Sequence, residues 1–435
     1  MRPDGAITSR APRVAALLAV VMATAPGAPG APGAVGAQAP ARVEVSPAGP
    51  VRSLTEALRL VAPGGTIVVR GGTWREGTIA VTKPVTIQGV GGPVLDGEGR
   101  HEIMTVRADD VTIRGLTFRA VGYSEIQDKA ALRVTESSRC RIEDNVVEDG
   151  FFGIYLARVE GCVVRGNRLR AVRRTEANAG NAIHLWTSRE VVVTDNDIRG
   201  WRDGIYFEFV RASRAERNTS EGNIRYGLHF MYSDSCRYVR NTFRRNGSGV
   251  AVMYTNVVEM VENRFEDNWG AAAYGLLLKE IGDPVLRGNH FSRNTVGLFS
   301  DGATRLVATG NEFRGNGWAV QLQANTQDSR FAGNDFLANT FDVATNAGSS
   351  TTVFDGNHFD EYAGYDLDRD GVGDVPHRPV RLFSMIVASH EAALVLLRSF
   401  FVGLLDAAER VIPALTPELL VDVHPAMRPV TRGTR

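Results

Sequence analysis

Between Asn218 and Tyr254 the chain reads NTSEGNIRYGLHFMYSDSCRYVRNTFRRNGSGVAVMY, and the second half of this stretch repeats the pattern of the first. Asn218 returns after 23 residues as Asn241, and Met231 returns after 22 as Met253. A period near 22 residues, with short alternating strands and no helix-length apolar run, is typical of a parallel β-solenoid. One turn of this length holds three strands of roughly 4–6 residues with tight corners between them.

The same spacing extends over more than half of the chain. Asparagine recurs every 22–29 residues, at Asn145, Asn167, Asn196, Asn218, Asn241, Asn263, Asn289, Asn311, Asn334 and Asn357. We expect these side chains to stack as an amide ladder and to take the left-handed backbone of a corner. Two residues after the later asparagines stand Phe243, Phe265, Phe291, Phe313, Phe336 and Phe359, which we expect to stack inside the core.

The remaining segments fit around this repeat. Residues 64–122 read as irregular opening turns, and residues 53–61 as a short amphipathic helix that caps the N-terminal end of the core. The predicted organisation is a signal peptide with its Pro/Gly/Ala-rich cleavage region over residues 1–39 and a β-helix over 43–363. An acidic turn follows over 364–379, and a C-terminal helix with an extended arm over 380–435. The apolar run from Val14 to Ala25 follows three arginines and is too short to span a bilayer, so we expect cleavage and export.

Charge and cysteine content limit the possible functions. The chain has 49 basic and 49 acidic residues, so nothing in its charge favours a nucleic-acid partner. Cys140, Cys162 and Cys236 each lie five residues before a repeat asparagine and share one inward position. A disulfide or a soft-metal site is conceivable for the first two, but we interpret all three as small core residues, because consecutive turns rarely offer good disulfide geometry.

One outward stripe carries unusual side chains. After each glycine corner, the second residue is outward and reads His184, Tyr206, His229 and Ala251 on successive turns, and the fourth reads Trp186, Glu208, Met231, Met253 and Lys279. Exposed methionine beside exposed histidine suits Cu(I). A lid or a partner protein covering the stripe is the other interpretation. Extra residues in two turns, 173–180 and 269–274, predict loops that overhang it.

Four turns of this stripe resemble a known family. The segments NAIHLW (181–186), RDGIYFEF (202–209), RYGLHFMY (225–232) and GVAVMY (249–254) are similar to the signature turns of NosD, a periplasmic β-helix protein required to mature nitrous oxide reductase. The tail YDLDRDGVGD (365–374), followed by PHRP (376–379), is similar to the end of that family's repeat domain. The resemblance runs from about Val43 to Pro429.

The resemblance implies a right-handed parallel β-helix and an accessory role rather than a reaction. It implies partnership with an ABC-type ATPase and a membrane permease, with a copper-chaperone lipoprotein as donor and nitrous oxide reductase as the client. The candidate copper or client-docking face then consists of His184, Glu208, His229, Met231 and Met253. Whether copper, a sulfur species or mechanical work passes to the client stays open.

The acidic tail has a chemistry of its own. Asp366, Asp368, Asp370 and Asp374 match positions 1, 3, 5 and 9 of a calcium loop, but position 12 is His377 rather than glutamate. Calcium and a solvated turn are therefore both open. Residues 382–412 then shift to a helical period with a wide apolar face, which predicts either an end cap or a surface that docks to the permease.

Two other classes of protein remain as alternatives. Exported β-helices include carbohydrate lyases and epimerases, and here Asp203, Glu208, Lys279, Glu280 and Asp301 could supply acid and base groups. The chain has no Asp-Pro-His-Asp run of the kind expected for an alginate epimerase. A passive scaffold or adhesin would tolerate loss of the whole stripe.

Overall fold

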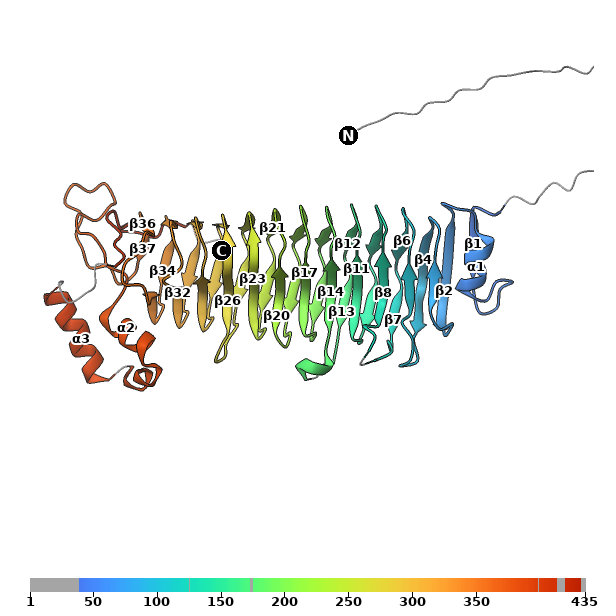
Figure 1. Ribbon diagram of the computed structural model, residues 1–435, viewed down its shortest axis with the longest axis horizontal. Coiled ribbons are helices and arrows are strands. Elements are labelled where there is room, and N and C mark those ends of the chain that lie inside the picture. Colours follow the sequence, from blue (N-terminus) through green and yellow to red (C-terminus); the bar gives the residue numbers. More distant parts are fainter. Residues whose placement is uncertain (1–38, 125, 173–174, 398, 413–418, 432–435) are drawn as a thin grey trace, which may run out of the picture. The chain divides into compact units, whose positions relative to one another are not determined.

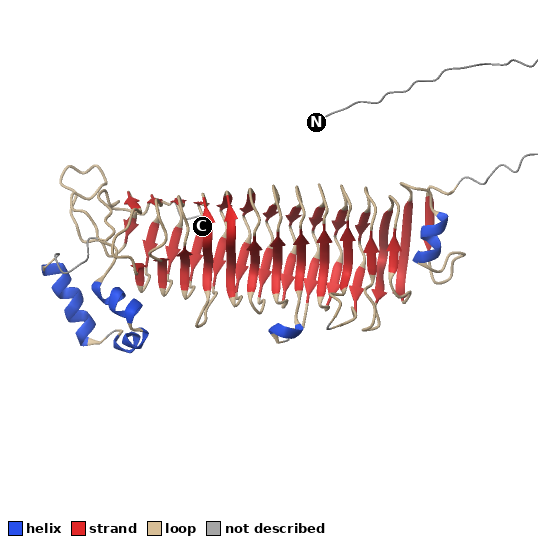
Figure 2. Ribbon diagram, viewed as in Figure 1, coloured by secondary structure: helices blue, strands red, loops and turns tan. Residues whose placement is uncertain are grey.

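Two parallel sheets wind along one axis in the computed structural model, which describes residues 39–124, 126–172, 175–397, 399–412 and 419–431 (Figures 1 and 2). The expected signal peptide lies outside the described residues. Sheet B has 12 strands and sheet A has 25. In the regular turns, one longer strand goes to sheet B and two short strands go to sheet A, so the predicted parallel β-helix is confirmed.

The strands of sheet B, in order, are β3 (Ile79–Val81), β5 (Met104–Val106), β8 (Ala130–Thr135), β11 (Phe152–Ala157), β14 (Asn181–Trp186), β17 (Asp203–Glu208), β20 (Tyr226–Met231), β23 (Ser248–Asn256), β26 (Tyr274–Gly282), β29 (Val296–Asp301), β32 (Trp318–Leu322) and β35 (Phe341–Thr345). Each pairs in parallel with the next, so equivalent residues of neighbouring turns lie side by side.

Sheet A is formed by β1 (Arg42–Val45), β2 (Thr66–Trp74), β4 (Thr86–Asp96), β6 (Thr112–Arg114), β7 (Thr117–Arg119), β9 (Arg141–Glu143), β10 (Val146–Glu148), β12 (Val163–Arg165), β13 (Arg168–Arg170), β15 (Val192–Thr194), β16 (Asp197–Arg199), β18 (Arg214–Glu216), β19 (Thr219–Glu221), β21 (Cys236–Val239), β22 (Thr242–Arg244), β24 (Val258–Val261), β25 (Arg264–Glu266), β27 (Val285–Arg287), β28 (His290–Ser292), β30 (Val307–Thr309), β31 (Glu312–Arg314), β33 (Arg330–Ala332), β34 (Asp335–Leu337), β36 (Val353–Asp355) and β37 (His358–Phe359).

The asparagine ladder joins consecutive turns of the β-helix through buried hydrogen bonds. Asn218 donates from its backbone N and its side-chain Nδ2 to Oδ1 of Asn241, at 2.9 and 3.0 Å, and the pattern repeats from turn to turn. The expectation that these asparagines take the left-handed conformation is wrong. The residue before each one takes it, for example Arg217 and Arg240 with φ of 49° and 55°. The corner bends one residue earlier, which leaves the asparagine free to point inward and be fully hydrogen-bonded.

The ladder is closed by a residue from far along the chain. Asn357 donates from its backbone N and from Nδ2 to Oδ2 of Asp422, at 2.9 and 2.8 Å. Asp422 also pairs through its backbone with His377 and is fully buried. The predicted C-terminal arm therefore lies over the body of the β-helix, with Asp422 in the place of the next asparagine.

The core contains the expected ribs. Stacked phenylalanines run along the inside of sheet A, and neighbouring ring centroids are 4.6 to 5.7 Å apart, at Phe243, Phe265, Phe291, Phe313, Phe336 and Phe359. At the N-terminal end, α1 (Leu54–Leu60) begins after Ser53, whose side chain accepts a hydrogen bond from the backbone N of Glu56. Its Leu54 and Ala57 are fully buried in the same core, so the predicted cap is confirmed.

The interpretation of the cysteines is wrong for two of the three. Cys140 and Cys162 form a disulfide inside the core, whereas Cys236 is a buried free thiol. Stacking brings the two Cα atoms to 4.6 Å, which lies within the range a disulfide spans. Neighbouring turns therefore bring two cysteines at this inward position within reach of each other.

The C-terminal helical region is divided into three pieces: α2 (Leu382–Ser389), the 3-10 helix η2 (Glu391–Leu396) and α3 (Phe400–Val411). The break before α3 follows from Ser399, whose side chain caps the helix by accepting from the backbone N of Val402. Phe383 and Val387 of α2 pack on Phe341 at the end of sheet B. No helix among the described residues is long and apolar enough to cross a bilayer.

Candidate metal and client-docking face

The five candidate residues His184, Glu208, His229, Met231 and Met253, here called the outer stripe, lie on four consecutive strands of sheet B, β14, β17, β20 and β23. The parallel register aligns His184 with Tyr206, His229 and Ala251, and it aligns Trp186 with Glu208, Met231 and Met253. In the structure the residues of both columns therefore follow one another in the predicted order.

Glycine is required where β17 and β20 leave their corners, whereas β14 has Ala182 at the equivalent position. A Cβ atom on Gly227 would lie 2.7 Å from the backbone oxygen of Gly249, closer than such atoms approach. Gly204 has the same contact with the oxygen of Gly227, at 2.5 Å. The glycines let consecutive turns approach closely, and this approach sets the outer stripe in register.

The expectation that the stripe histidines are exposed is wrong. His184 is 7% exposed and His229 is 6% exposed. Aromatic rings cover them from the neighbouring turns, because the centroids of Tyr155, His184, Tyr206 and His229 follow one another at 4.7 Å. Tyr226 contacts the His229 ring from its own strand, with 4.8 Å between centroids.

The predicted overhanging loop is part of this cover. It contains the 3-10 helix η1 (Glu176–Asn178). Glu176 lies 3.7 Å from the guanidinium of Arg225 at the start of β20, and Asn178 accepts a hydrogen bond from Tyr123 at 3.3 Å. The loop is thereby fastened beside the two imidazoles.

The two histidines differ in what holds their Nδ1 atoms. Nδ2 of Asn181 donates to His184 Nδ1 at 3.1 Å, while Oδ1 of the same amide accepts from Arg202. Burial, with the charge of Arg202 adding to it, lowers the pKa of His184 to about 3. A neutral imidazole that accepts at Nδ1 carries its hydrogen on Nε2. His184 is therefore a donor at its outer nitrogen, not a ready metal ligand.

His229 faces a carboxylate instead. Its Nδ1 lies 3.7 Å from Asp203 Oδ2 and 3.3 Å from the guanidinium of Arg225, which also binds Asp203. Burial acts to raise the pKa of Asp203, but its contacts with His229 and Arg225 hold that pKa below the usual value. A guanidinium can only donate, so in the contact with Arg225 the Nδ1 atom accepts and Nε2 carries the hydrogen. The alternative tautomer, in which Nδ1 donates to Asp203, leaves a lone pair on Nε2. A carboxylate behind the imidazole is the usual support of a metal-binding histidine.

The outer nitrogens of both histidines are buried and have no hydrogen-bond partner among the described residues. Buried polar atoms without a protein partner are rare and indicate a bound water, an ion or another ligand, or a strained site. His184 and His229 are two turns apart, about 10 Å, with Tyr206 between them. One ion cannot contact both, so the structure separates His184 from the rest of the stripe.

The two methionines lie on the strand of His229 and on the next strand of sheet B. Met231 follows it by two residues on the same side of β20, and its Sδ accepts a hydrogen bond from Tyr206 Oη at 3.5 Å. Met253 is the aligned residue of the next turn. Glu208 is the aligned residue of the previous turn, and burial raises the pKa of its carboxyl while His229 opposes the shift. One imidazole nitrogen and two thioethers form a donor set that fits Cu(I).

Sequence reasoning missed the supports of this site. Asp203 appeared only as a candidate sugar-processing acid, and the orienting roles of Asn181 and Arg225 were not foreseen. Asn181 and Asp203 are aligned in neighbouring strands and fully buried. The equivalent places in later turns hold Tyr226, Ser248, Tyr274, Val296 and Trp318, so an amide or carboxylate at this strand start was the available signal.

The acidic tail brings three of its four predicted ligands together. Carboxylate oxygens of Asp366, Asp368 and Asp370 lie within 4.8 Å of one another, whereas Asp374 accepts from the backbone N of Leu367 at 2.7 Å. His377, at the twelfth position, is turned onto the ring of Phe359 with 4.4 Å between centroids. Calcium binding by this loop stays a prediction.

Comparison with known proteins agrees with the resemblance seen in the sequence. Residues 169–364 match the family model described as "Periplasmic copper-binding protein (NosD)". A protein named "Probable ABC transporter binding protein NosD" from Pseudomonas aeruginosa is 28% identical over 371 residues, which cover 81% of this chain and 86% of that protein. A protein of the same name from Stutzerimonas stutzeri is 25% identical over 373 residues, covering 81% and 85%. These names describe a binding protein, not an enzyme.

Solved structures share the fold. The A-module of the mannuronan C-5 epimerase AlgE6 from Azotobacter vinelandii superposes with a TM-score of 0.56 at 14% identity, over 69% of this chain and 93% of that module. The catalytic unit of an α-1,3-glucanase from Streptomyces thermodiastaticus gives a TM-score of 0.53 at 15% identity, over 72% and 65%. At such identities the likeness concerns the β-helix alone.

Proposed function

We propose that this chain, which is similar to the NosD family of periplasmic copper-binding proteins, is the periplasmic component of an ABC-type complex that matures nitrous oxide reductase. Its partners are the ATPase and the membrane permease of that complex, the reductase as client, and a copper-chaperone lipoprotein as donor. The names of the two relatives support the link to an ABC transporter.

Copper is the cargo in this proposal, not a resident cofactor. His229 Nε2 and the sulfur atoms of Met231 and Met253 hold it, with Glu208 at the edge of the group. Asp203 accepts the Nδ1 hydrogen when the His229 imidazole takes the tautomer whose Nε2 lone pair binds copper. Copper supplies a soft cation that thioethers hold weakly enough to release, which suits transfer to a client.

His184 plays a different part in this arrangement. Its ring lies against Tyr206, which donates to Met231, so it supports the aromatic cover of the site from the side away from the methionines. Glu208, which is partly exposed, belongs to the docking surface, whereas the buried His184 supports the site from behind. His229, Met231 and Met253 hold the cargo.

The observation that carries the proposal is the His229 imidazole. It is buried, a carboxylate lies behind its Nδ1, its Nε2 has no partner among the described residues, and two thioethers in register stand beside it. A surface that only packs against a covering loop does not require a carboxylate behind a buried imidazole in combination with two aligned thioethers.

The experiment is complementation of a strain that lacks the gene. It scores nitrous oxide reduction and the copper content of the purified reductase. We expect the deletion to give a reductase without its catalytic copper centre. The double variant Met231→Ala/Met253→Ala should lower reductase copper and weaken Cu(I) binding to the isolated protein at least tenfold. Met427→Ala, a partly buried methionine of the C-terminal arm, is the matched control.

Two results would contradict the proposal in different ways. A fully loaded reductase in the deletion strain rejects maturation as the function and returns attention to the carbohydrate-active alternative. Normal Cu(I) affinity in the double methionine variant rejects only the assignment of the soft donors.

A further inference from the structure

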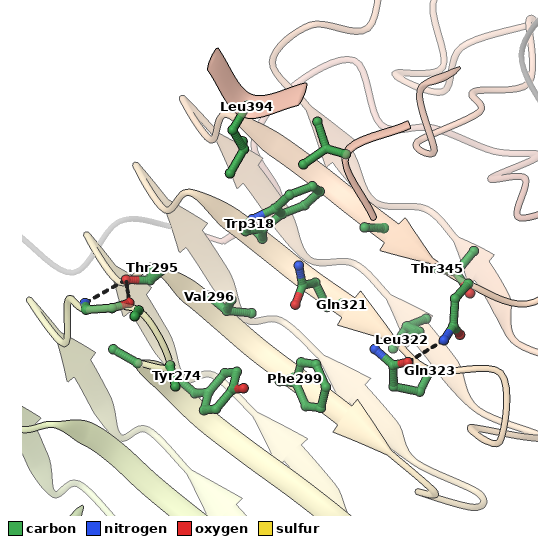
Figure 3. Close-up of a pocket in the computed structure, with 17 residues that line it drawn as sticks. Tyr274, Thr295, Val296, Phe299, Trp318, Gln321, Leu322, Gln323, Thr345 and Leu394 are labelled. Atoms are coloured by element: carbon green, nitrogen blue, oxygen red, sulfur yellow. Dashed lines mark hydrogen bonds between the residues drawn. The ribbon is translucent and has the colours of Figure 1, made fainter. Parts of the chain in front are cut away.

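A cleft of about 490 Å³ lies on the outer face of sheet B, beyond the outer stripe (Figure 3). Its floor is formed by β26, β29, β32 and β35. The predicted second overhanging loop, with residues 270–273, forms one wall, and Leu394 of η2 lies over the other side. None of the 17 residues that line it carries a formal charge, although 23% of the chain is charged.

The cleft offers aromatic faces and one free amide. The Trp318 ring is stacked on Phe341 with centroids 4.1 Å apart, which fixes its orientation. Tyr274 and Phe299 contact each other at 5.0 Å, and Gln321 lies between them and Trp318 (Figure 3). The side-chain amides that line the cleft differ in their hydrogen bonding. Asn346 donates to the Gln323 oxygen at 2.5 Å, whereas the Gln321 amide has no hydrogen-bond partner among the described residues.

The cleft continues the column that holds His229. In parallel register, His229 is followed by Ala251, Leu277 and Phe299, so the floor between the two sites is apolar. Three turns separate His229 from Phe299, about 14 Å. The adjacent column passes from Met253 to Lys279 and Asp301.

Lys279 and Asp301 lie 3.9 Å apart, so their charges offset each other beside this floor. The path from the outer stripe to the cleft therefore has no net charge. A peptide segment that lies along this path is not repelled by a net charge, and it needs no charged side chain of its own to bind there.

We propose that this cleft binds an uncharged polypeptide segment of the client, with a bulky apolar side chain against Trp318 and Phe299 and a backbone group hydrogen-bonded to the Gln321 amide. The inference rests on the proposed function, because it names the partner's recognition element. An extended chain advances about 3.4 Å per residue. The apolar anchor therefore lies about four residues from the group that faces His229.

The chemistry of the cleft favours a polypeptide over a sugar. A neutral saccharide presents hydroxyl groups around its ring, which need several polar partners when buried. The cleft has one free side-chain amide, because the other two, of Gln323 and Asn346, are paired with each other. A uronate polymer would in addition need a cation, and the lining has none. A volume near 490 Å³ is within the ordinary range for one or two large side chains with their backbone.

The test places a charge in the cleft and compares it with the same change outside. Gln321→Lys puts an ammonium group between Trp318 and Phe299. Gln327→Lys makes the identical substitution in the same turn, at an exposed residue that does not line the cleft. Thermal unfolding checks that both variants are folded.

Three probes are used with the full-length protein. The first is copper-free nitrous oxide reductase, measured by biolayer interferometry. The second is an array of acetylated, amidated heptapeptides of glycine, serine and alanine with a central Leu, Phe, Lys or Asp. The third is a neutral oligosaccharide, tri-N-acetylchitotriose. We expect the reductase and the Leu or Phe peptides to bind, Gln321→Lys to weaken both at least tenfold, and Gln327→Lys to leave both unchanged.

The outcomes separate this inference from the proposed function. If the reductase does not bind but the apolar peptides do and depend on Gln321, the cleft stands and the identity of the client is wrong. If the reductase binds equally to wild type and Gln321→Lys, the cleft is rejected while the maturation role stands. Selective binding of the oligosaccharide, or equal binding of charged and apolar peptides, also overturns the inference.

Discussion

Replacing one asparagine of the ladder should loosen the β-helix locally by a large amount. Asn241 makes four side-chain hydrogen bonds: its Oδ1 accepts from the backbone N and Nδ2 of Asn218, and its Nδ2 donates to the backbone oxygen of Ala215 and to Oδ1 of Asn263. Asn241→Ala leaves two buried donors of Asn218 and the oxygen of Ala215 without partners. Each orphaned group costs about 1–3 kcal/mol, so for the three groups we expect a loss of about 3–9 kcal/mol.

The measurement is hydrogen exchange followed by mass spectrometry, because the backbone N–H of Asn218 is itself one of the orphaned groups. Solenoid stability is approximately a sum over neighbouring turns, so the effect should concentrate in peptides near residues 214–244 and fade with distance. Urea unfolding followed by circular dichroism gives the accompanying shift in midpoint.

The matched control is Asn256→Ala, at an exposed asparagine of β23 that is not part of the ladder. Its effect should stay below about 0.5 kcal/mol. If Asn241→Ala changes exchange no more than Asn256→Ala, the buried amides are not what holds consecutive turns together, and the reasoning is refuted.

Three further predictions concern the C-terminal part. Asp422→Ala removes the acceptor of two hydrogen bonds from Asn357, so exchange over residues 353–359 should rise by an order of magnitude or more, while Val423→Ala at an exposed neighbour should not change it. Burial lowers the pKa of His377 to about 4, against about 6.5 in an unfolded chain. Because the unfolded state binds the proton more strongly, stability is fully present above pH 6.5 and falls towards pH 4, by about 3 kcal/mol; His377→Phe should abolish this part of the pH dependence of urea unfolding. Calcium titrated into the protein should release or absorb heat with wild type and not with Asp366→Asn/Asp370→Asn; the absence of any calorimetric signal with wild type would leave the loop as a solvated turn.

The structure also changes how the C-terminal helices should be tested. Truncation after Pro379 would remove Asp422 along with α2 and α3, so loss of function could reflect an open ladder rather than a lost docking surface. Phe400 is 87% exposed and Val411 is 80% exposed on α3. Phe400→Ser with Val411→Ser alters that surface and leaves the arm in place.

The repeat made the fold and the register of the outer stripe predictable. Once the period is known, the alignment of His229 with Tyr206 and of Met231 with Met253 follows from counting residues. Burial did not follow, because the cover of the histidines depends on the sizes of Tyr155, Tyr206 and Tyr226 together.

Other features depended on contacts that carry no periodic signal. Asp422 lies 65 residues after Asn357 and belongs to no repeat, so its place in the ladder could not be inferred. The disulfide between Cys140 and Cys162 depended on how closely two turns approach, which spacing alone does not state. The tautomer of His184 required the position of Arg202, which fixes the Asn181 amide.

The closure of the ladder by Asp422 has a consequence for the order of biogenesis. A chain made from its N-terminus can add each turn to the one before as soon as about 22 residues have emerged, so growth of the stack is local and sequential. The final turn is different, because the backbone N–H and side-chain amide of Asn357 have their hydrogen-bond acceptor only after Asp422, 65 residues later in the chain, has been made. Until then the last strands of the sheet have unpaired backbone groups to which another strand can bind. Once Asp422 binds Asn357, the C-terminal arm covers this edge and prevents further strand pairing.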